Sequence, residues 1–134
     1  MEKLTFKIET RLINWNEVAQ MAYSKDSTKY SRTKKRQQTF IKHEIMNQLA
    51  DIHNYFGSSK VSVSYKWHTS TKFDLGNLAA GEKFIADSIN ELKIWDDDFN
   101  IKKITHERIT SKNDYVQVTI SGKMTNDNKE TRSH

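Results

Sequence analysis

The chain has 134 residues, of which 35% are hydrophobic and 29% charged, which fits a single domain with a modest core. It contains no cysteine, and this excludes a disulfide scaffold and any thiolate-bound zinc site. No apolar run approaches the roughly 20 residues that span a bilayer, and no signal-peptide core opens the chain, so we expect a cytoplasmic protein without membrane contacts.

The net charge of +5 comes from one segment. Residues 23–42 carry seven basic residues against Asp26 alone, a net +6, so the rest of the chain sums to −1. A polyanionic partner is the natural inference, because each phosphate neutralised by Lys or Arg releases counterions. A solvated, lysine-rich helix start is the alternative, but the nearby Trp15, Tyr23 and Tyr30 favour nucleic acid. The residues expected to grip backbone phosphates are Lys29, Arg32, Lys34, Lys35 and Arg36.

In chain order, residues 3–10 alternate apolar and polar side chains, which predicts a half-buried strand. A polar loop is expected over about 14–32. A helix is then expected from Thr33, as its N-cap, to about Phe56, with Gly57 ending it as the C′ residue. The apolar residues at helical spacing are Ile41, Ile45, Leu49, Ile52 and Phe56.

A second strand follows, in which Val61, Val63, Tyr65 and Trp67 alternate with polar residues. A second helix is expected over about 78–93, with Leu78, Ile85, Ile89 and Leu92 facing inward. Residues 100–109 and 115–121 read as two further strands, joined as a hairpin through the turn at 111–114.

The order β-α-β-α-β-β predicts an α+β fold, a four-stranded mixed sheet with two helices on one face. We expect the folded domain to cover residues 1–121. The polar stretch 122–134 has almost nothing to bury and is expected to be a disordered tail.

Acidic residues flank the second predicted helix. Asp74 lies just past the second strand, and Asp97 and Asp98 lie just before the third. If those strands are neighbours, the helix between them is expected to bring the carboxylates together at one end of the sheet. Carboxylate oxygens suit Mg²⁺ or Mn²⁺, ions that catalyse phosphate-ester cleavage. The plain alternative is an acidic turn before a strand.

These residues resemble the signature of the RusA-type Holliday junction resolvases and their phage relatives. That signature has Asp-x-Asp-Asn, a helix bearing a lysine, and an Asp-Asp pair; here Asp74-Leu75-Gly76-Asn77, Lys83 and Asp97-Asp98 stand in those places. The resemblance covers most of residues 1–121. It implies a homodimeric, Mg²⁺-dependent endonuclease, with Mn²⁺ as substitute, that resolves four-way DNA junctions by paired nicks. A phage-encoded protein of this kind acts in the host cytoplasm.

The resemblance also implies roles for single residues. Asp74 and Asp98 bind the metal and Asp97 assists them, while Lys83 stabilises charge on the phosphate or steers the attacking water. Lys83 has a plain alternative, because it precedes Asp87 by four residues and fits an ordinary helical ion pair. No Gly-rich phosphate loop is present, so no nucleotide cofactor is expected.

Two further residues are candidates for DNA contact, and one position departs from the pattern. Lys72 is placed to hold a phosphate near the metal, and Trp15 to stack on an unpaired base. The second acid of the motif is Gly76 here. Either Asp96 or Glu82 supplies the missing carboxylate, or the chain is a weakened or inactive junction-binding protein on the same scaffold. A structural dimer whose basic loop contacts an acidic protein is a third hypothesis.

Overall fold

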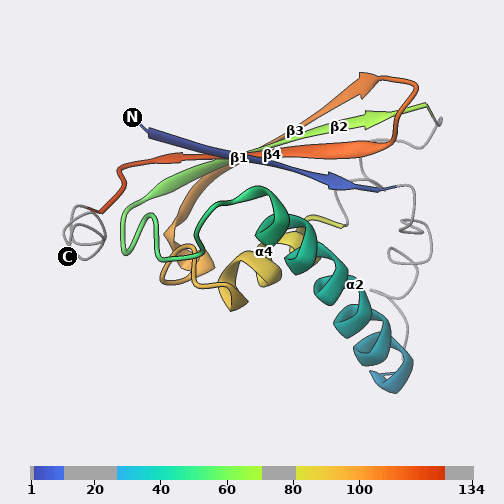
Figure 1. Ribbon diagram of the computed structural model, residues 1–134, viewed down its shortest axis with the longest axis horizontal. Helices are drawn as coiled ribbons and strands as arrows, with labels where there is room; N and C mark the ends of the chain where they lie inside the picture. The colour runs from blue at the N-terminus through green and yellow to red at the C-terminus, as the bar shows by residue number, and fades with distance from the viewer. Residues whose placement is uncertain (1, 11–26, 71–80, 126–134) are drawn as a thin grey trace.

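The computed structural model describes residues 2–10, 27–70 and 81–125, and it shows a mixed sheet covered on one face by two helices (Figure 1). The strands are β1 (Glu2–Glu9), β2 (Val61–Thr69), β3 (Ile101–Thr110) and β4 (Tyr115–Gly122). The helices are α2 (Ser27–Gln48), α4 (Glu82–Glu91) and the short 3₁₀ helix η1 (Asp98–Asn100). The predicted α+β class, the four-stranded mixed sheet and the helices on one face are thereby confirmed.

The strand order across the sheet is β1-β4-β2-β3. Strand β2 pairs with β3 in parallel, whereas β4 pairs antiparallel with both β1 and β2. Because β1, β2 and β3 begin at the same end of the sheet and β4 ends there, that end collects residues from distant parts of the sequence.

The core lies between the sheet and the two helices. The alternation predicted for β2 is confirmed, since its odd-numbered residues from Val61 to Thr69 are buried and face the helices. Helix α2 contributes Ile41 and Ile45, each fully buried. The remaining large, fully buried side chains are Phe6, Ile8, Phe56, Ile85, Ile89, Ile94, Trp95 and Ile120. Within the described residues no helix is long and apolar enough to cross a membrane.

The predicted bounds of the first helix were wrong at both ends. Helix α2 begins at Ser27, so Thr33 lies inside it rather than at its N-cap, and it ends at Gln48. The Gln48 side chain accepts the backbone N–H of Lys7 at 2.7 Å, which ties the end of the helix to β1. The apolar spacing continues to Phe56 because the irregular segment after the helix still packs on the core. Spacing alone does not distinguish the two.

The predicted hairpin between the last two strands was also wrong. Strand β2 lies between β3 and β4, so the segment 111–114 crosses the end of β2 instead of forming a tight turn. The Asp114 carbonyl accepts the Thr10 N–H at 3.0 Å, and its carboxylate accepts the Ser70 N–H at 3.0 Å. Asp114 therefore fastens the ends of β1 and β2 to the start of β4.

The folded domain extends a few residues beyond the predicted boundary at 121. Strand β4 includes Gly122, and the Thr125 N–H donates to the Tyr55 carbonyl at 2.9 Å. Residues 122–125 therefore belong to the ordered body rather than to the expected tail. Residues 126–134 lie outside the described part of the chain.

Candidate functional site

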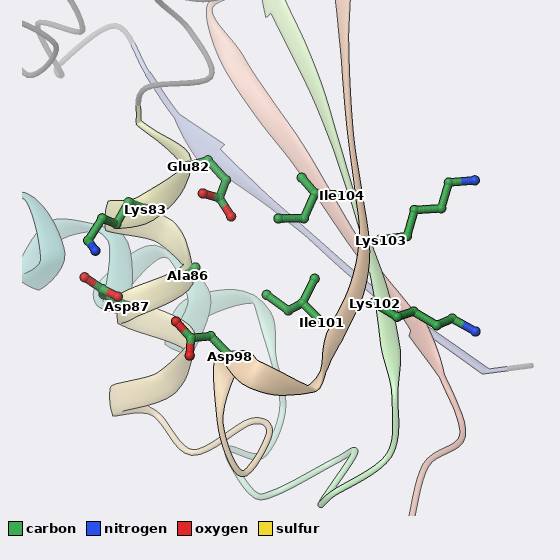
Figure 2. Close-up of a pocket in the computed structure, with 9 residues that line it drawn as sticks. All are labelled: Glu82, Lys83, Ala86, Asp87, Asp98, Ile101, Lys102, Lys103 and Ile104. Atoms are coloured by element: carbon green, nitrogen blue, oxygen red, sulfur yellow. The ribbon is translucent and has the colours of Figure 1, made fainter.

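An open groove of about 500 Å³ lies between α4 and the first half of β3 (Figure 2). Acidic side chains from α4 and η1 line one side, and Ile101 and Ile104 line the other. Lys102 and Lys103 also border the groove, but Figure 2 shows their side chains pointing away from α4. The residues of α4 and η1 in the groove are Glu82, Lys83, Ala86, Asp87 and Asp98.

Helix α4 faces the groove with a polar stripe because its other face is committed to the core. Phe84, Ile85 and Ile89 are buried against the sheet, and the Ser88 hydroxyl donates to the Phe84 carbonyl at 2.8 Å. Glu82 precedes the buried Ile85 by about one helical turn, so its side chain lies at the boundary between the core and the groove. The amphipathic pattern of the helix thus places carboxylates beside apolar surface.

The carboxyl group of Glu82 has a raised pKa in the groove. Burial raises the pKa of its carboxyl, and the charges of Asp87 and Asp98 raise it further. The Tyr65 hydroxyl donates to Glu82 Oε1 at 3.5 Å, a long hydrogen bond that partly offsets this rise in pKa. The pKa of Tyr65 is itself raised well above 10, chiefly by burial, so the phenol stays a neutral donor.

Asp97 and Asp98 act as a pair at the start of β3. The Asp97 side chain caps η1 by accepting the Phe99 N–H at 3.3 Å, and its hydrogen bond to Asp98 lowers the pKa of Asp97. The same bond, with burial and repulsion from Asp97, raises the pKa of Asp98. The Asn90 side chain donates to Asp98 and opposes that rise, while the Asn90 amide oxygen accepts the buried Trp95 indole N–H.

Asp87 links the groove to the basic helix. Its carboxylate lies 3.0 Å from Lys34 Nζ on α2, and a second ion pair joins Lys42 to Glu91 at 2.6 Å. Lys34 was expected to grip DNA; its ammonium pairs with α4 in the structure, and its contact with DNA stays a prediction. Pairs as exposed as these are worth about 0.2–1 kcal/mol each, so they mainly fix how the two helices meet.

The other basic residues predicted on α2 behave differently. Arg32, Lys35 and Arg36 are exposed and recur at helical spacing, so they form one basic stripe. Lys29 lies in the first turns of α2, but its side chain is outside the described part of the structure. The predicted cationic surface is therefore present in the three described residues, while its use in DNA binding stays a prediction.

The expectation that strand order brings the residues after β2 to the Asp97–Asp98 pair before β3 was wrong. Because β2 and β3 are parallel, Ser70, the last described residue before Asp74, lies at the opposite end of the sheet from Asp98. The nine residues of β2 separate those ends by about 30 Å. Strand polarity alone therefore does not bring Asp74 to Asp97 and Asp98. Asp74 and Lys72 themselves lie outside the described residues.

Of the remaining predicted site residues, some lie in the described part of the chain and others lie outside it. Lys83 is exposed and borders the groove, and Figure 2 shows it pointing toward Asp87 and away from Ile101 and Ile104. Both interpretations of Lys83, the catalytic one and the helical ion pair, stay predictions. Trp15 and Gly76 lie outside the described residues. Asp96 does not border the groove, because its carboxylate accepts the Asn54 amide at 2.5 Å.

Glu82 is the groove residue that the sequence singled out least. It was named only as one of two substitutes for the acid missing at Gly76, and the structure separates the two: Glu82 borders the groove with Asp98, and Asp96 does not. In residues 2–10, 27–70 and 81–125, no three Asp, Glu or His side chains are grouped closely enough to hold a metal ion together. The described groove thus offers carboxylates suited to a hard cation, but not a complete ligand set.

No protein-family model and no curated protein matches the chain. Among solved structures, the thiamine monophosphate kinase of Aquifex aeolicus is 8% identical over 66% of this chain and 27% of its own, with a TM-score of 0.35. The HypE-HypF complex is 9% identical over 90% of this chain and 32% of that chain, with a TM-score of 0.37. The chain spans a third or less of these proteins, and likenesses this low assign neither a fold family nor a function.

Proposed function

We propose that the protein is a metal-dependent endonuclease acting on branched DNA, with the groove between α4 and β3 as the place where the phosphate ester is cut. The proposal draws on the resemblance of the acidic motif to the RusA-type resolvases. It also draws on the exposed basic stripe of α2, which suits backbone phosphates. In this proposal the enzyme reads the shape of the junction more than its base sequence.

The observation that carries the proposal is that α4 and η1 bring Glu82, Asp87 and Asp98 to the border of one groove. Glu82 and Asp98 both have raised pKa values, and each is raised in part by neighbouring carboxylates. Like charges held this close are unfavourable unless a proton or a cation neutralises them. Near neutral pH protons are scarce, so a divalent cation is the natural partner.

The chemistry of these donors fits Mg²⁺. Asp98 and Asp97 would hold it, with Glu82 as the carboxylate that replaces the acid absent at Gly76. Asp74 is left out of this set because the end of β2 that precedes it lies about 30 Å from Asp98. When bound, such an ion lowers the pKa of water and neutralises charge on the phosphate. The protein's own side chains have supporting tasks: Asn90 and Trp95 fix Asp98, and Tyr65 fixes Glu82.

Junction cleavage tests this proposal directly. The protein is incubated with a synthetic four-way DNA junction and Mg²⁺ or Mn²⁺, with a linear duplex of the same sequence as control. We expect paired nicks near the branch point, loss of product in Asp98→Asn, and slower cleavage in Glu82→Gln. Asp51→Asn, at an exposed carboxylate outside the groove, should cut as the unmodified protein does. Absence of product at any metal concentration would overturn the proposal.

A non-cutting junction-binding protein is the second candidate, and Gly76 is the specific observation that favours it. It predicts tight, shape-dependent junction binding without product. The variant Gly76→Asp restores the acid of the motif, so it should bring a large gain in cutting if the rest of the site is intact. No gain from this variant would mean that the motif was misassigned.

Paired nicking also requires two active sites, and we propose that a homodimer supplies them. Light scattering on the purified protein, with and without junction DNA, measures the mass directly. A monomer in both conditions would remove this part of the proposal.

A further inference from the structure

The face of the sheet opposite the helices carries an ordered set of polar side chains that none of the sequence motifs predicted. Lys3 pairs with Ser121, Ser121 with Ser62, and Ser62 with Lys103. These four cross-strand neighbours form one row across the whole sheet, about 14 Å from first to last at ordinary strand spacing. A serine pair therefore lies between two lysines.

The next row along the strands consists of hydroxyls alone. Its members pair in the same way across the four strands, and they are Thr5, Thr119, Ser64 and Thr105. The two threonine hydroxyls of β1 and β4 lie 3.3 Å apart. A third row restores positive charge with Lys7 and Lys66. The pattern is thus a band of hydroxyl groups between two lysine-bearing rows.

The first two rows enclose a shallow depression of about 250 Å³. Its polar lining comes from two lysines and four hydroxyl residues, namely Lys3, Lys103, Ser62, Ser64, Thr105 and Ser121. A second depression of about 420 Å³ lies at the same end of the sheet, where β1, β2 and β3 begin. Its lining adds three lysines and one carboxylate, namely Lys60, Lys102, Lys123 and Glu2.

This surface is net positive, whereas the acidic and basic residues that border the groove are equal in number. Seven lysines border the helix-free face or its end, against the carboxylates of Glu2, Glu9 and Glu107, a net +4. The net charge along the sequence does not reveal this surface, because all residues outside 23–42 together carry a net charge of −1. The lysines come from positions as distant as 3 and 123, and only strand pairing gathers them.

Composition excludes an apolar partner for this face. In the four rows set by the described strand pairing, Ile109 is the one aliphatic side chain, and it lies at the far end from the lysine-bearing depressions. Beside it, the rings of His68 and Tyr115 stack at 4.2 Å, with Lys7 Nζ 5.1 Å from the Tyr115 ring. Such a face lacks the apolar centre of a stable protein interface. Hydroxyls and ammonium groups are instead the donors that proteins place on phosphates.

We propose that the helix-free face of the sheet binds a single strand of nucleic acid through its phosphate backbone. The lysines of the first row neutralise phosphates at both edges, and the hydroxyl rows donate to phosphate oxygens between them. A duplex meets an open sheet face along a narrow line, whereas a single strand can follow successive rows and bring a base to the His68–Tyr115 pair. This surface lies on the other face of the sheet from the groove, with Lys102 and Lys103 at the border of both, and the proposal does not depend on nuclease activity.

Equilibrium binding of the full chain to a fluorescent oligothymidylate of about 16 nucleotides tests the proposal, with chelator present so that no metal-dependent cutting occurs. The test variant is Lys3→Gln with Lys103→Gln, two exposed substitutions that leave the strands unchanged. Each single-strand phosphate contact contributes about 0.7 to the slope of log affinity against log salt. Two lost contacts should lower that slope by about 1.4 and the affinity about 25-fold near 0.1 M salt.

The matched control is Lys93→Gln with Arg108→Gln, which removes the same charge from exposed positions off this face, since Arg108 pairs with Trp67 on the helix-covered side of the sheet. It should bind within about twofold of the unmodified protein. An equal loss in test and control variants would overturn the proposal, because it would indicate only a response to net charge.

Backbone amide NMR shifts on titration of the unmodified protein with the same oligonucleotide give an answer that needs no variant. Shifts at Ser62, Ser64 and Thr105 support the proposal, and shifts confined to α2 refute it. If junction cleavage fails but these shifts occur, the nuclease proposal alone is lost.

Discussion

One partly buried hydrogen bond, between Trp67 and His106, is expected to make the stability of the fold depend on pH. The Trp67 indole N–H donates to His106 Nδ1 at 3.0 Å, and both rings stack against the Tyr65 ring. The substitution His106→Leu removes this acceptor. Loss of an acceptor from a buried donor costs about 1–3 kcal/mol, so we expect the free energy of unfolding to fall by that amount at about pH 7.5.

Acid should have a related effect on the unmodified protein. Burial lowers the pKa of His106 below its ordinary 6.5, so the unfolded chain takes up a proton that the folded chain refuses. Stability due to this histidine is therefore present above pH 6.5 and is lost as the pH falls toward the lowered pKa. The slope cannot exceed about 1.4 kcal/mol per pH unit, and partial exposure of the ring keeps it below that limit.

Urea unfolding between about pH 7.5 and pH 5.5 measures both effects. Burial also lowers the pKa of His68, with help from Lys7 and Lys66, so the unmodified protein contains a contribution from each histidine. The difference between the unmodified protein and His106→Leu isolates His106, and His43→Leu, an exposed position on α2, is the matched control. An unchanged stability at pH 7.5 together with an unchanged pH slope would refute the reasoning.

Three further substitutions test the packing. Gly57→Ala should cost about 1–3 kcal/mol in urea unfolding, because φ is +56° and an added Cβ would lie 2.5 Å from Thr125 Cγ2; unchanged stability would contradict this. Lys34→Met should cost less than about 1 kcal/mol by the same measurement, since its pair with Asp87 is partly exposed, and a loss above about 2 kcal/mol would show that the pair does more than align the helices. Ile45→Ala should cost about 2–5 kcal/mol, seen as a large fall in the thermal midpoint, because the side chain is fully buried.

Local pattern was enough to predict most elements of the fold. The alternation from Val61 to Trp67 located β2 because burial on one face of a strand has period two. The bounds of α2 were less predictable, since Phe56 continues the helical spacing from a segment that is no longer helical. A capping residue such as Thr33 is also only a local preference, which the helix bypasses when its earlier residues can continue the turn.

The candidate site was also only partly predictable from local sequence pattern. The sequence named Asp97, Asp98 and Lys83, and the structure places Asp98 and Lys83 at one groove. The sequence did not distinguish Glu82 from Asp96, because the two carboxylates differ in their contacts with residues distant in sequence. The Tyr65 hydroxyl donates to Glu82, and the Asn54 amide donates to Asp96. Such contacts leave no periodic signal in the sequence.

By itself the sequence determined the α+β class, the amphipathic elements and the types of side chain available for chemistry, because these depend on residue type and near-neighbour spacing. Only the tertiary structure decided the strand order, in which β2 separates β3 from β4 and sets Ser70 and Asp98 at opposite ends of the sheet. It also decided that Lys3 and Lys103 share a row. Strand neighbours are selected by long-range pairing and core packing, and that information is not local.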